Sequence, residues 1–396
     1  MNNKKVIIIT SIVTAVAVFT LSALFFLSPL GIVLVGRLSD SAVGQSYGKL
    51  IKIEKIINSN FMGSYNPGSL MDSAVHSYVA SLRDPYSFYY DRSEFKDLTS
   101  TLDGEYRGIG VVVFSKNNKI VVKSVNPSSP AEKAGIIAGD IIIAINSVNY
   151  SGEELASAVN AIKDTKVGKT VSLDILRGEE TKKIDIKIEK VKEILVTSRM
   201  LDGNLGYVDL SSFGTNVTED FLNAVDSLKN SGAKGFVIDL RSNPGGSLDS
   251  AVGIADIFLP EGNIVTIRDK KGDEEIYTSD KAALNMPVCV LINEHSASAS
   301  EVVAGALKDY KLATLVGKKT FGKGVVQSVM DLGDGSGLSL TIAKYYTPSG
   351  ECIHGVGIEP DIEVDLPEGV EFIPGEELYN DTQLQAAVEE LKSKIK

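Results

Sequence analysis

The stretch from Pro287 to Leu307 constrains the fold more than any other part of this sequence. Its first six residues are continuously apolar and rich in β-branched side chains, which predicts a short buried strand. A turn at 293–295 follows, and small residues then lead into an apolar-periodic helix. Three serines alternate with alanines at this helix start: Ser296, Ser298 and Ser300. A strand, a tight turn and a helix start place a hydroxyl beside free backbone N–H groups, which suits a nucleophile, although serines there can also simply cap the helix.

Length and composition bound what the rest of the chain can be. At 396 residues the chain is long enough for two or three domains. Its formal net charge is −11 and no block rich in Lys and Arg stands out, so we expect no nucleic-acid partner. Two cysteines are too few for a disulfide framework or a zinc cluster, and no nucleotide-binding loop stands out, so we expect no metal and no cofactor. A histidine-dependent mechanism has only three candidates: His76, His295 and His354.

Residues 1–37 predict a membrane anchor. An uncharged run from Val6 to Val35 follows Lys4 and Lys5, and it exceeds the roughly 20 apolar residues that a membrane-spanning helix needs. The leading lysines favour an amino terminus in the cytoplasm. We therefore expect a single-pass protein of the cell membrane with its catalytic domain outside the cytoplasm. A cleaved signal peptide is the alternative, and it also places the globular part outside the cytosol.

Residues 38–103 predict an N-terminal helical segment. Apolar residues recur at helical spacing over 45–61 and again over 70–82, on either side of the breaker Asn66-Pro67-Gly68. The two apolar stripes fit either a local core or a subunit interface.

Residues 104–191 change to a strand-forming character. A strand is expected over 109–114, and a short helix follows with Pro130 at its first position and Gly135 at its end. The segment resembles a PDZ domain of bacterial periplasmic proteases, most specifically through the run 129–135 and the following Gly139-Asp140.

The resemblance to a PDZ domain implies a peptide-binding role. Gly108, Ile109 and Gly110 lie at the entry to the first strand, where glycines let successive N–H groups form a nest for a carboxylate. A peptide would then add as a strand along 109–114, with its free carboxyl terminus in the nest. The alternative is that the glycines only shape the entry to the strand.

Residues 192–374 predict a second, larger domain, and 375–396 predict a C-terminal helix. Strands alternate with helices from Leu205 onward, which is typical of an α/β core around a central sheet. Asn216-Val217-Thr218-Glu219 fits a capping box at the start of one of these helices.

Five motifs, taken in order, resemble the carboxyl-terminal processing peptidases, also called tail-specific proteases. They are Asp84-Pro85-Tyr86-Ser87 and the runs 239–246, 293–301, 320–327 and 355–361. Together with the PDZ segment, they cover nearly everything after the anchor. The resemblance implies a serine protease whose α/β core is of the crotonase or ClpP type, with an inserted PDZ domain. It also implies homo-oligomers in some members, held by terminal helices.

The same resemblance assigns the catalytic residues. Ser298 falls on the nucleophile, Lys323 on the general base and Gln327 on the residue that orients the lysine. The family spacing of 25 positions selects Ser298 over the serines on either side, since 323 − 298 = 25. The chemistry agrees, because a serine hydroxyl needs a base, and a lysine with an ordinary pKa of about 10.4 must be neutral to act as one. His295 is the alternative base.

An oxyanion needs hydrogen-bond donors. The N–H of Ala299, just after the nucleophile, is the first candidate, and the N–H of either Gly245 or Gly246 is the second. Taken by itself, the turn that holds these glycines fits an ordinary turn equally well. His295 departs from the family pattern, in which a small residue is common, and we expect it to crowd or electrostatically tune the site.

These patterns together predict a membrane-anchored serine endopeptidase that cleaves extracytoplasmic proteins. Its partners would be protein or peptide substrates with free carboxyl termini, which the PDZ domain captures. Two alternatives stay open: a non-catalytic PDZ scaffold on an inactive protease-like domain, and a hydrolase of small esters.

Overall fold

The computed structural model describes residues 42–102, 105–215, 217–280, 283–370, 372 and 380–395. The predicted membrane anchor over 1–37 lies outside these ranges, as does Asn216 of the predicted capping box. Within the described ranges, none of the helices has the length and the apolar run that a bilayer crossing requires.

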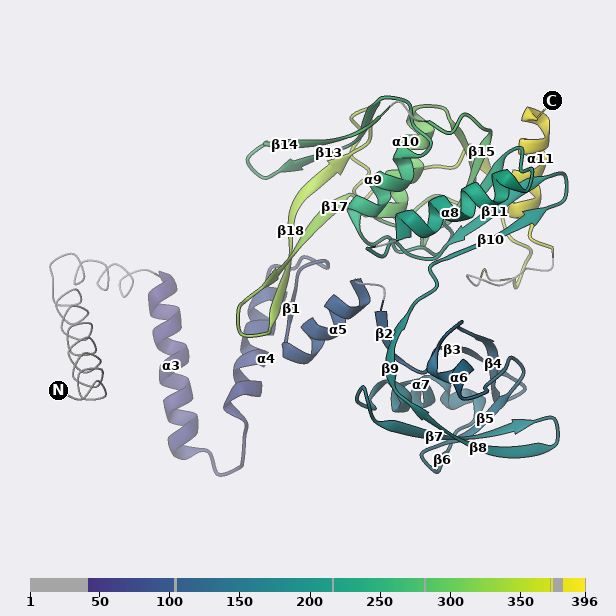
Figure 1. Ribbon diagram of the computed structural model, residues 1–396. Coiled ribbons are helices and arrows are strands. Elements are labelled where there is room, and N and C mark those ends of the chain that lie inside the picture. Colours follow the sequence, from purple (N-terminus) through teal and green to yellow (C-terminus); the bar gives the residue numbers. More distant parts are fainter. Residues whose placement is uncertain are drawn as a thin grey trace, which may run out of the picture. The chain divides into compact units, whose positions relative to one another are not determined.

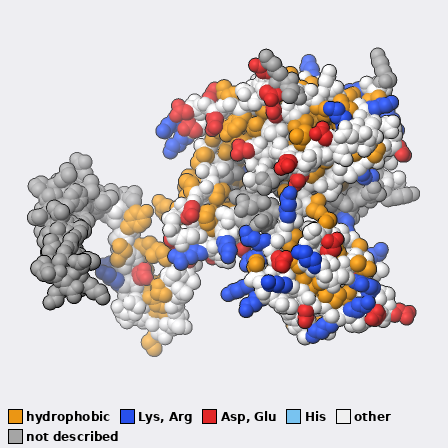
Figure 2. Space-filling model, viewed as in Figure 1, with side chains coloured by type: hydrophobic (Ala, Val, Ile, Leu, Met, Phe, Trp, Pro, Cys, Tyr) orange, Lys and Arg blue, Asp and Glu red, His pale blue; other side chains and the backbone are white. Residues whose placement is uncertain are grey.

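The described chain divides into two units, one up to Ser73 and one from Ala74 onward. Helix α3 (Ala42–Asn60) belongs to the first unit, and helix α4 (Pro67–Ala80) begins there. Asn66 starts α4 by accepting the Gly68 N–H through its side chain at 2.8 Å. The apolar side chains of α3 stay largely exposed, with Ile51 at 58% and Ile56 at 53% (Figure 2). The predicted stripes therefore exist, and within the described residues they do not form a closed core.

Two elements that the sequence did not predict lie in the segment before residue 103. Strand β1 (Phe88–Tyr90) pairs antiparallel with the distant strand β18 (Gly337–Tyr346). Helix α5 (Arg92–Leu102) follows it, and the Asp91 carboxylate caps this helix by accepting the N–H groups of Ser93 and Glu94. The expected all-helical segment thus contributes a strand to a sheet built mainly from residues after 260.

The PDZ part is a sheet in the order β3-β4-β5-β7-β8, with β6 paired to β5. Strands β2 (Glu105–Gly108) and β9 (Glu189–Lys192) pair antiparallel where the chain enters and leaves the PDZ part. Helices α6 (Pro130–Lys133) and α7 (Leu155–Lys163) complete it (Figure 1). Because β3 is the last strand of its sheet, one edge of β3 has no partner strand in that sheet. The strands of this sheet are β3 (Val111–Lys116), β4 (Lys119–Val125), β5 (Ile141–Ile145), β6 (Val148–Asn149), β7 (Thr170–Arg177) and β8 (Glu180–Lys187).

The larger part is built on a sheet in the order β10-β11-β12-β15-β16-β19. All its pairings are parallel except that of β10 with β11. Alternate residues of its central strands enter two different cores, as their continuous apolar runs predict. The strands are β10 (Val196–Leu201), β11 (Leu205–Leu210), β12 (Phe236–Asp239), β15 (Val288–Ile292), β16 (Ala313–Gly317) and β19 (Ile362–Glu363).

Helices cover both faces of this sheet (Figure 1). Helices α8 (Val217–Asn230), α9 (Leu248–Asp256) and α10 (Ala299–Asp309) pack on one face, and α11 (Thr382–Lys394) packs on the other. Cys289 of β15 is fully buried in the core between the sheet and α11, and burial raises the pKa of its thiol to about 12. Cys289 therefore packs as a small buried hydrophobe.

A second, antiparallel sheet stands beside the first and runs β1-β18-β13-β14, with β17 (Val325–Asp331) on the other edge of β18. Strands β13 (Gly262–Asp269) and β14 (Glu274–Ser279) were not predicted. The turn around Gly333–Gly337 is the tip of the β17–β18 hairpin. This sheet brings strand β17, and with it the end of the loop 320–324, alongside the start of α10.

Candidate active site

The turn between β15 and α10 has the strained geometry of a nucleophile turn. Ser298 is the residue just before α10, and its backbone φ is 56°, in the left-handed region that non-glycine residues rarely occupy. Such a conformation costs on the order of 1–3 kcal/mol and persists only where the surrounding contacts fix it. The sharp turn directs the Ser298 side chain into a cavity at the amino end of the helix.

The structure separates the three alternating serines. Ser296 and Ser300 are fully buried, and their hydroxyls donate to the carbonyls of Leu240 at 2.7 Å and Asn243 at 2.9 Å. Both therefore hold the turn against the segment after β12. Ser298, by contrast, is half-buried and lines the cavity.

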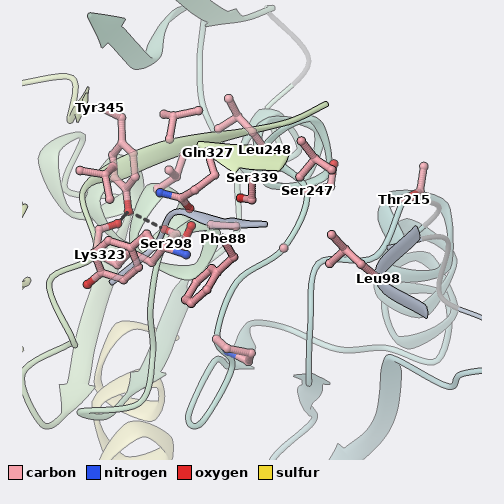
Figure 3. A pocket seen from close by; sticks show the side chains of 18 of the residues that line it. Phe88, Leu98, Thr215, Ser247, Leu248, Ser298, Lys323, Gln327, Ser339 and Tyr345 are labelled. Carbon is pink, nitrogen blue, oxygen red and sulfur yellow. Dashed lines mark hydrogen bonds between the residues drawn. The ribbon is translucent and has the colours of Figure 1, made fainter. Parts of the chain in front are cut away.

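The cavity has a volume of about 560 Å³ and holds all three predicted catalytic residues. Figure 3 shows Ser298, Lys323 and Gln327 converging on it from the start of α10, from the 320–324 loop and from β17. One wall is apolar and aromatic. It is formed mainly by Tyr86, Phe88, Tyr90, Leu98, Leu248, Val302 and Val329.

Lys323 lies in a half-buried position. Burial lowers the pKa of its amine, and the carboxylates of Asp84 and Glu301 oppose that shift. The Nζ atom lies 4.9 Å from the centroid of the Tyr86 ring, a cation–π geometry that favours the ammonium form. The net pKa is nevertheless below the ordinary value, which is the direction that a lysine base requires.

Glu301 joins the nucleophile turn to the lysine loop. Its buried carboxylate accepts the backbone N–H groups of Ser298 at 2.9 Å and Lys323 at 2.8 Å on one oxygen. The other oxygen accepts the N–H of Gly322 at 2.7 Å and the hydroxyl of Thr320 at 2.6 Å. Burial raises the pKa of Glu301, and these four donors oppose that effect. The sequence pattern did not predict this role, although Glu301 ends the motif 293–301.

Gln327 is connected to the Asp84-Pro85-Tyr86-Ser87 motif through the second sheet. Its amide nitrogen donates to the Thr341 hydroxyl at 3.3 Å, and the Thr341 N–H donates to the Ser87 hydroxyl at 3.1 Å. The Ser87 hydroxyl in turn donates to Asp84 at 2.5 Å. Burial would raise the pKa of Asp84, but hydrogen bonds from Ser87, Thr341 and the Tyr86 N–H outweigh it and lower the pKa. The direct effect of Gln327 on Lys323 stays a prediction.

The turn after β12 packs directly against the nucleophile. Gly245 has a φ of 100°, and a Cβ there would lie 2.8 Å from the Cβ of Ser298, so no side chain fits. The Gly245 N–H already donates to the Asn243 side chain at 2.9 Å. The Gly245 carbonyl accepts the Phe213 N–H, and the next N–H, that of Gly246, therefore points the opposite way. Gly246 and Ala299 both line the cavity.

The predicted carboxylate nest of the PDZ part has a defined backbone. The carbonyls of Ile109 and Gly110 accept the N–H groups of Ala131 and Asn126. Because carbonyl and N–H point in opposite directions across a trans peptide, the N–H groups of Gly110 and Val111 face away from that loop. Gly110 has a φ of 83°, and a Cβ on it would collide with Ser129. Carboxylate binding by Gly108, Ile109 and Gly110 stays a prediction.

His295 is not part of the catalytic cavity. It is exposed and lines a separate cavity with Lys318, Lys319 and Gln383. The expectation that it crowds the site is wrong, because the side chain leaves the turn on the other side from Ser298. In the part of the chain that the structure describes, no three His, Cys, Asp or Glu side chains gather as a metal site.

The structure places a strand–turn–helix serine and a half-buried lysine in one cavity, in a chain that also carries a small separate domain of strands and short helices, and this combination is typical of serine hydrolases. Comparison with known proteins specifies the class. Residues 204–364 match peptidase family S41, and residues 108–188 match the PDZ domain.

Two relatives show how far the similarity extends. The chain is 36% identical over 338 residues to the carboxy-terminal processing protease CtpA of Bacillus subtilis (strain 168), covering 85% of this chain and 72% of that protein. It is 35% identical over 400 residues to a Staphylococcus epidermidis (strain ATCC 35984) protein named "Probable CtpA-like serine protease", covering 99% of this chain and 78% of that one. The chain therefore belongs to peptidase family S41, as a carboxyl-terminal processing peptidase with a PDZ domain.

A solved structure supports the fold alone. The crystal structure of a Bacteroides fragilis protein classed with the S41 proteases shares 20% identity with this chain and has a TM-score of 0.56. The superposition covers 84% of this chain and 91% of that one.

Proposed function

We propose that this chain is a serine endopeptidase in which Ser298 is the nucleophile and Lys323 the general base. The observation that carries the proposal is the separation of the three serines. Only Ser298 of the alternating set lines the cavity, and it shares that cavity with a lysine whose pKa burial lowers.

The reaction follows from this arrangement. The neutral Lys323 amine takes the proton of the Ser298 hydroxyl as its oxygen bonds to the carbonyl carbon of the scissile peptide bond. When the tetrahedral intermediate collapses, the Lys323 ammonium gives that proton to the leaving amine, and an acyl ester remains on Ser298. Water then attacks the ester with Lys323 again as base, releasing a peptide with a new carboxyl terminus and restoring the Ser298 hydroxyl.

We assign the oxyanion hole to the N–H groups of Ala299 and Gly246. Ala299 begins α10, so its N–H adds to the positive end of the helix dipole. Gly246 is preferred over Gly245 because the N–H of Gly245 is already bonded to Asn243. Removing one such donor typically costs about 3–4 kcal/mol of transition-state stabilisation.

The substrate would be an extended polypeptide captured by its tail. The unpartnered edge of β3 and the outward N–H groups after Ile109 support addition of a strand with its carboxylate in the nest. The aromatic and apolar cavity wall supports apolar residues beside the scissile bond. We further infer from residues 1–37 that the enzyme is anchored in the cell membrane and acts outside the cytoplasm. Homo-oligomers formed through the terminal helices also stay a prediction.

The test compares the full chain with Ser298→Ala and Lys323→Ala on an unfolded polypeptide whose carboxyl terminus is free or amidated. We expect both variants to lose nearly all turnover, because nucleophile and base act as one unit. We expect amidation to slow the wild type, because it removes the charge that the nest binds. Equal turnover by variants and wild type would support a non-catalytic PDZ scaffold, and turnover of short esters alone would support the small-ester hydrolase.

A further inference from the structure

Tyr345 holds a position that the proposed dyad does not itself explain. It lies near the end of β18, is 3% exposed, and lines the catalytic cavity. Its hydroxyl lies between two backbone carbonyls, that of Ser298 at 3.0 Å and that of Lys323, with which it makes a short hydrogen bond (Figure 3). One phenol hydroxyl therefore contacts the backbone of both proposed catalytic residues.

The backbone of Tyr345 holds the same loop. Its N–H donates to the carbonyl of Gly324 at 3.2 Å, immediately after Lys323. Two consecutive carbonyls of the lysine loop are thus fixed to one residue of β18. Gly324 also packs closely against His354, where a Cβ would lie 2.5 Å from the His354 backbone nitrogen, so the loop has little room to shift away from β18.

Glu301 supplies the complementary half of this connection. It binds the N–H groups of Ser298 and Lys323, and Tyr345 binds their carbonyls. The Ser298 carbonyl also accepts the N–H groups of Glu301 and Val302 at the start of α10. Because Ser298 has a strained φ, contacts on both of its flanking peptide groups are what keep its hydroxyl directed into the cavity.

We propose that Tyr345 is a positioning residue that sets the spacing between the nucleophile turn and the lysine loop. The inference rests on the proposed Ser298–Lys323 dyad. A phenol suits this role because its rigid ring carries one donor to a point between the carbonyl oxygens of Ser298 and Lys323. Burial raises the pKa of Tyr345 well above its ordinary value, so the hydroxyl remains a protonated donor.

The test is Tyr345→Phe in the full chain, assayed on an internally quenched peptide with a free carboxyl terminus. Phenylalanine keeps the ring and its packing and removes only the hydroxyl. We expect kcat to fall about tenfold to a hundredfold, because a displacement of about 1 Å in a catalytic group has that effect. We expect KM to stay close to the wild-type value, since the hydroxyl faces the protein backbone and not the substrate.

The pH profile supplies a readout that a purely structural role would not move. The titratable groups that act on the Lys323 amine are Asp84, Glu301 and Tyr86, and His354 packs against the next residue, Gly324. In Tyr345→Phe, a loosened lysine loop lets water reach the Lys323 amine while these groups stay in place. Because burial is what lowers the pKa of Lys323, that pKa should rise. The acid limb of the kcat profile should therefore move to higher pH.

The matched control is Tyr346→Phe, which removes a hydroxyl from the neighbouring residue of β18. Tyr346 is half-buried beneath the Arg268 guanidinium and lies outside the cavity lining, so its variant should keep wild-type kcat and pH profile. The inference is overturned if Tyr345→Phe keeps the wild-type kcat, or if its loss matches the unfolded fraction measured by urea titration. Equal rates for wild type and Ser298→Ala would instead overturn the proposed dyad.

Discussion

Glu301 is the residue that shows most directly how the site is held together. A buried carboxylate is costly unless donors surround it, and here four donors from two separate segments do so. All four contacts are local to the catalytic cavity. The hydrogen bonds that stabilise the Glu301 carboxylate therefore also hold the lysine loop against the start of α10.

Glu301→Gln should impair both folding and catalysis. An amide keeps the shape but places an NH₂ group against two of the four donors, and each buried donor left unsatisfied costs about 1–3 kcal/mol. We expect a lower free energy of unfolding in urea and a kcat reduced by at least about tenfold, since the dyad spacing relaxes. Glu294→Gln, an exposed change in the same turn, is the control and should alter neither quantity. A fully active and stable Glu301→Gln would contradict the account.

At this scale the sequence predicts side chains that carry chemistry better than those that position it. Residue type, motif and spacing pointed to Ser298 and Lys323, and the structure places both in one cavity, while their catalytic roles stay a proposal. Glu301 and Tyr345 both contact the lysine loop from positions about 20 residues away along the chain, and no periodicity or composition records such contacts. The contact between Glu301 and the Ser298 N–H is local and fits a capping box, which is the one sequence signal that could have pointed to Glu301. The position of the His295 side chain was mispredicted for a related reason. His295 is close to Ser298 in sequence, but sequence distance along a turn does not tell in which direction a side chain points.

At the scale of elements, two buried ion pairs that share Arg241 attach the C-terminal helix α11 to the catalytic sheet. Arg241, 1% exposed, binds Asp239 at the end of β12 and Asp381 at the start of α11. Phe372 covers the guanidinium at 4.0 Å from its ring centroid. Arg241 is also the first residue of the turn that ends in Gly246. Through the Arg241–Asp381 ion pair, helix α11 therefore stabilises the proposed oxyanion turn from the opposite face of the sheet.

The PDZ part contains an ion pair that should make its stability depend on pH. Asp140 is 1% exposed and binds Arg177 of β7 through both oxygens at 2.7 and 2.8 Å. Burial alone would raise the pKa of Asp140, but Arg177 and the Ile137 N–H outweigh it and lower the pKa below 3.8. A lowered folded-state pKa contributes stability above the unfolded-state pKa, and that stability is lost as the pH falls through the folded-state value.

We therefore expect hydrogen exchange in β5 and β7 of the full chain, corrected for intrinsic rates, to accelerate as the pH falls into the acid range. Asp140→Asn should show faster exchange at neutral pH and a weaker dependence on pH, because its side chain no longer titrates. Asp185→Asn, an exposed change on β8, is the control. An unchanged pH dependence in Asp140→Asn would contradict the assignment.

At the scale of the whole molecule, the second unit contains one core in its PDZ part and two cores on opposite faces of the catalytic sheet. Strong apolar periodicity and short turns predicted most elements of all three, but not β13, which contributes Ile264 and Val265 to one of the two catalytic-sheet cores. Strand β1 was not predicted because its three residues acquire strand geometry only by pairing with β18, whose residues lie 247 to 251 positions further along the chain (337 − 90 and 339 − 88). The active-site wall that β1 carries was missed for the same reason.

The central claim is that Lys323 activates Ser298 and no other serine of the turn. The most direct test is labelling of the full chain with a fluorophosphonate, which bonds to an activated serine oxygen and loses fluoride, followed by mass mapping of the labelled residue. The account predicts label on Ser298 alone, and labelling slowed at least about a hundredfold in Lys323→Ala, as expected when a general base is removed. Label on Ser296 or Ser300, or wild-type labelling rates in Lys323→Ala, would contradict it.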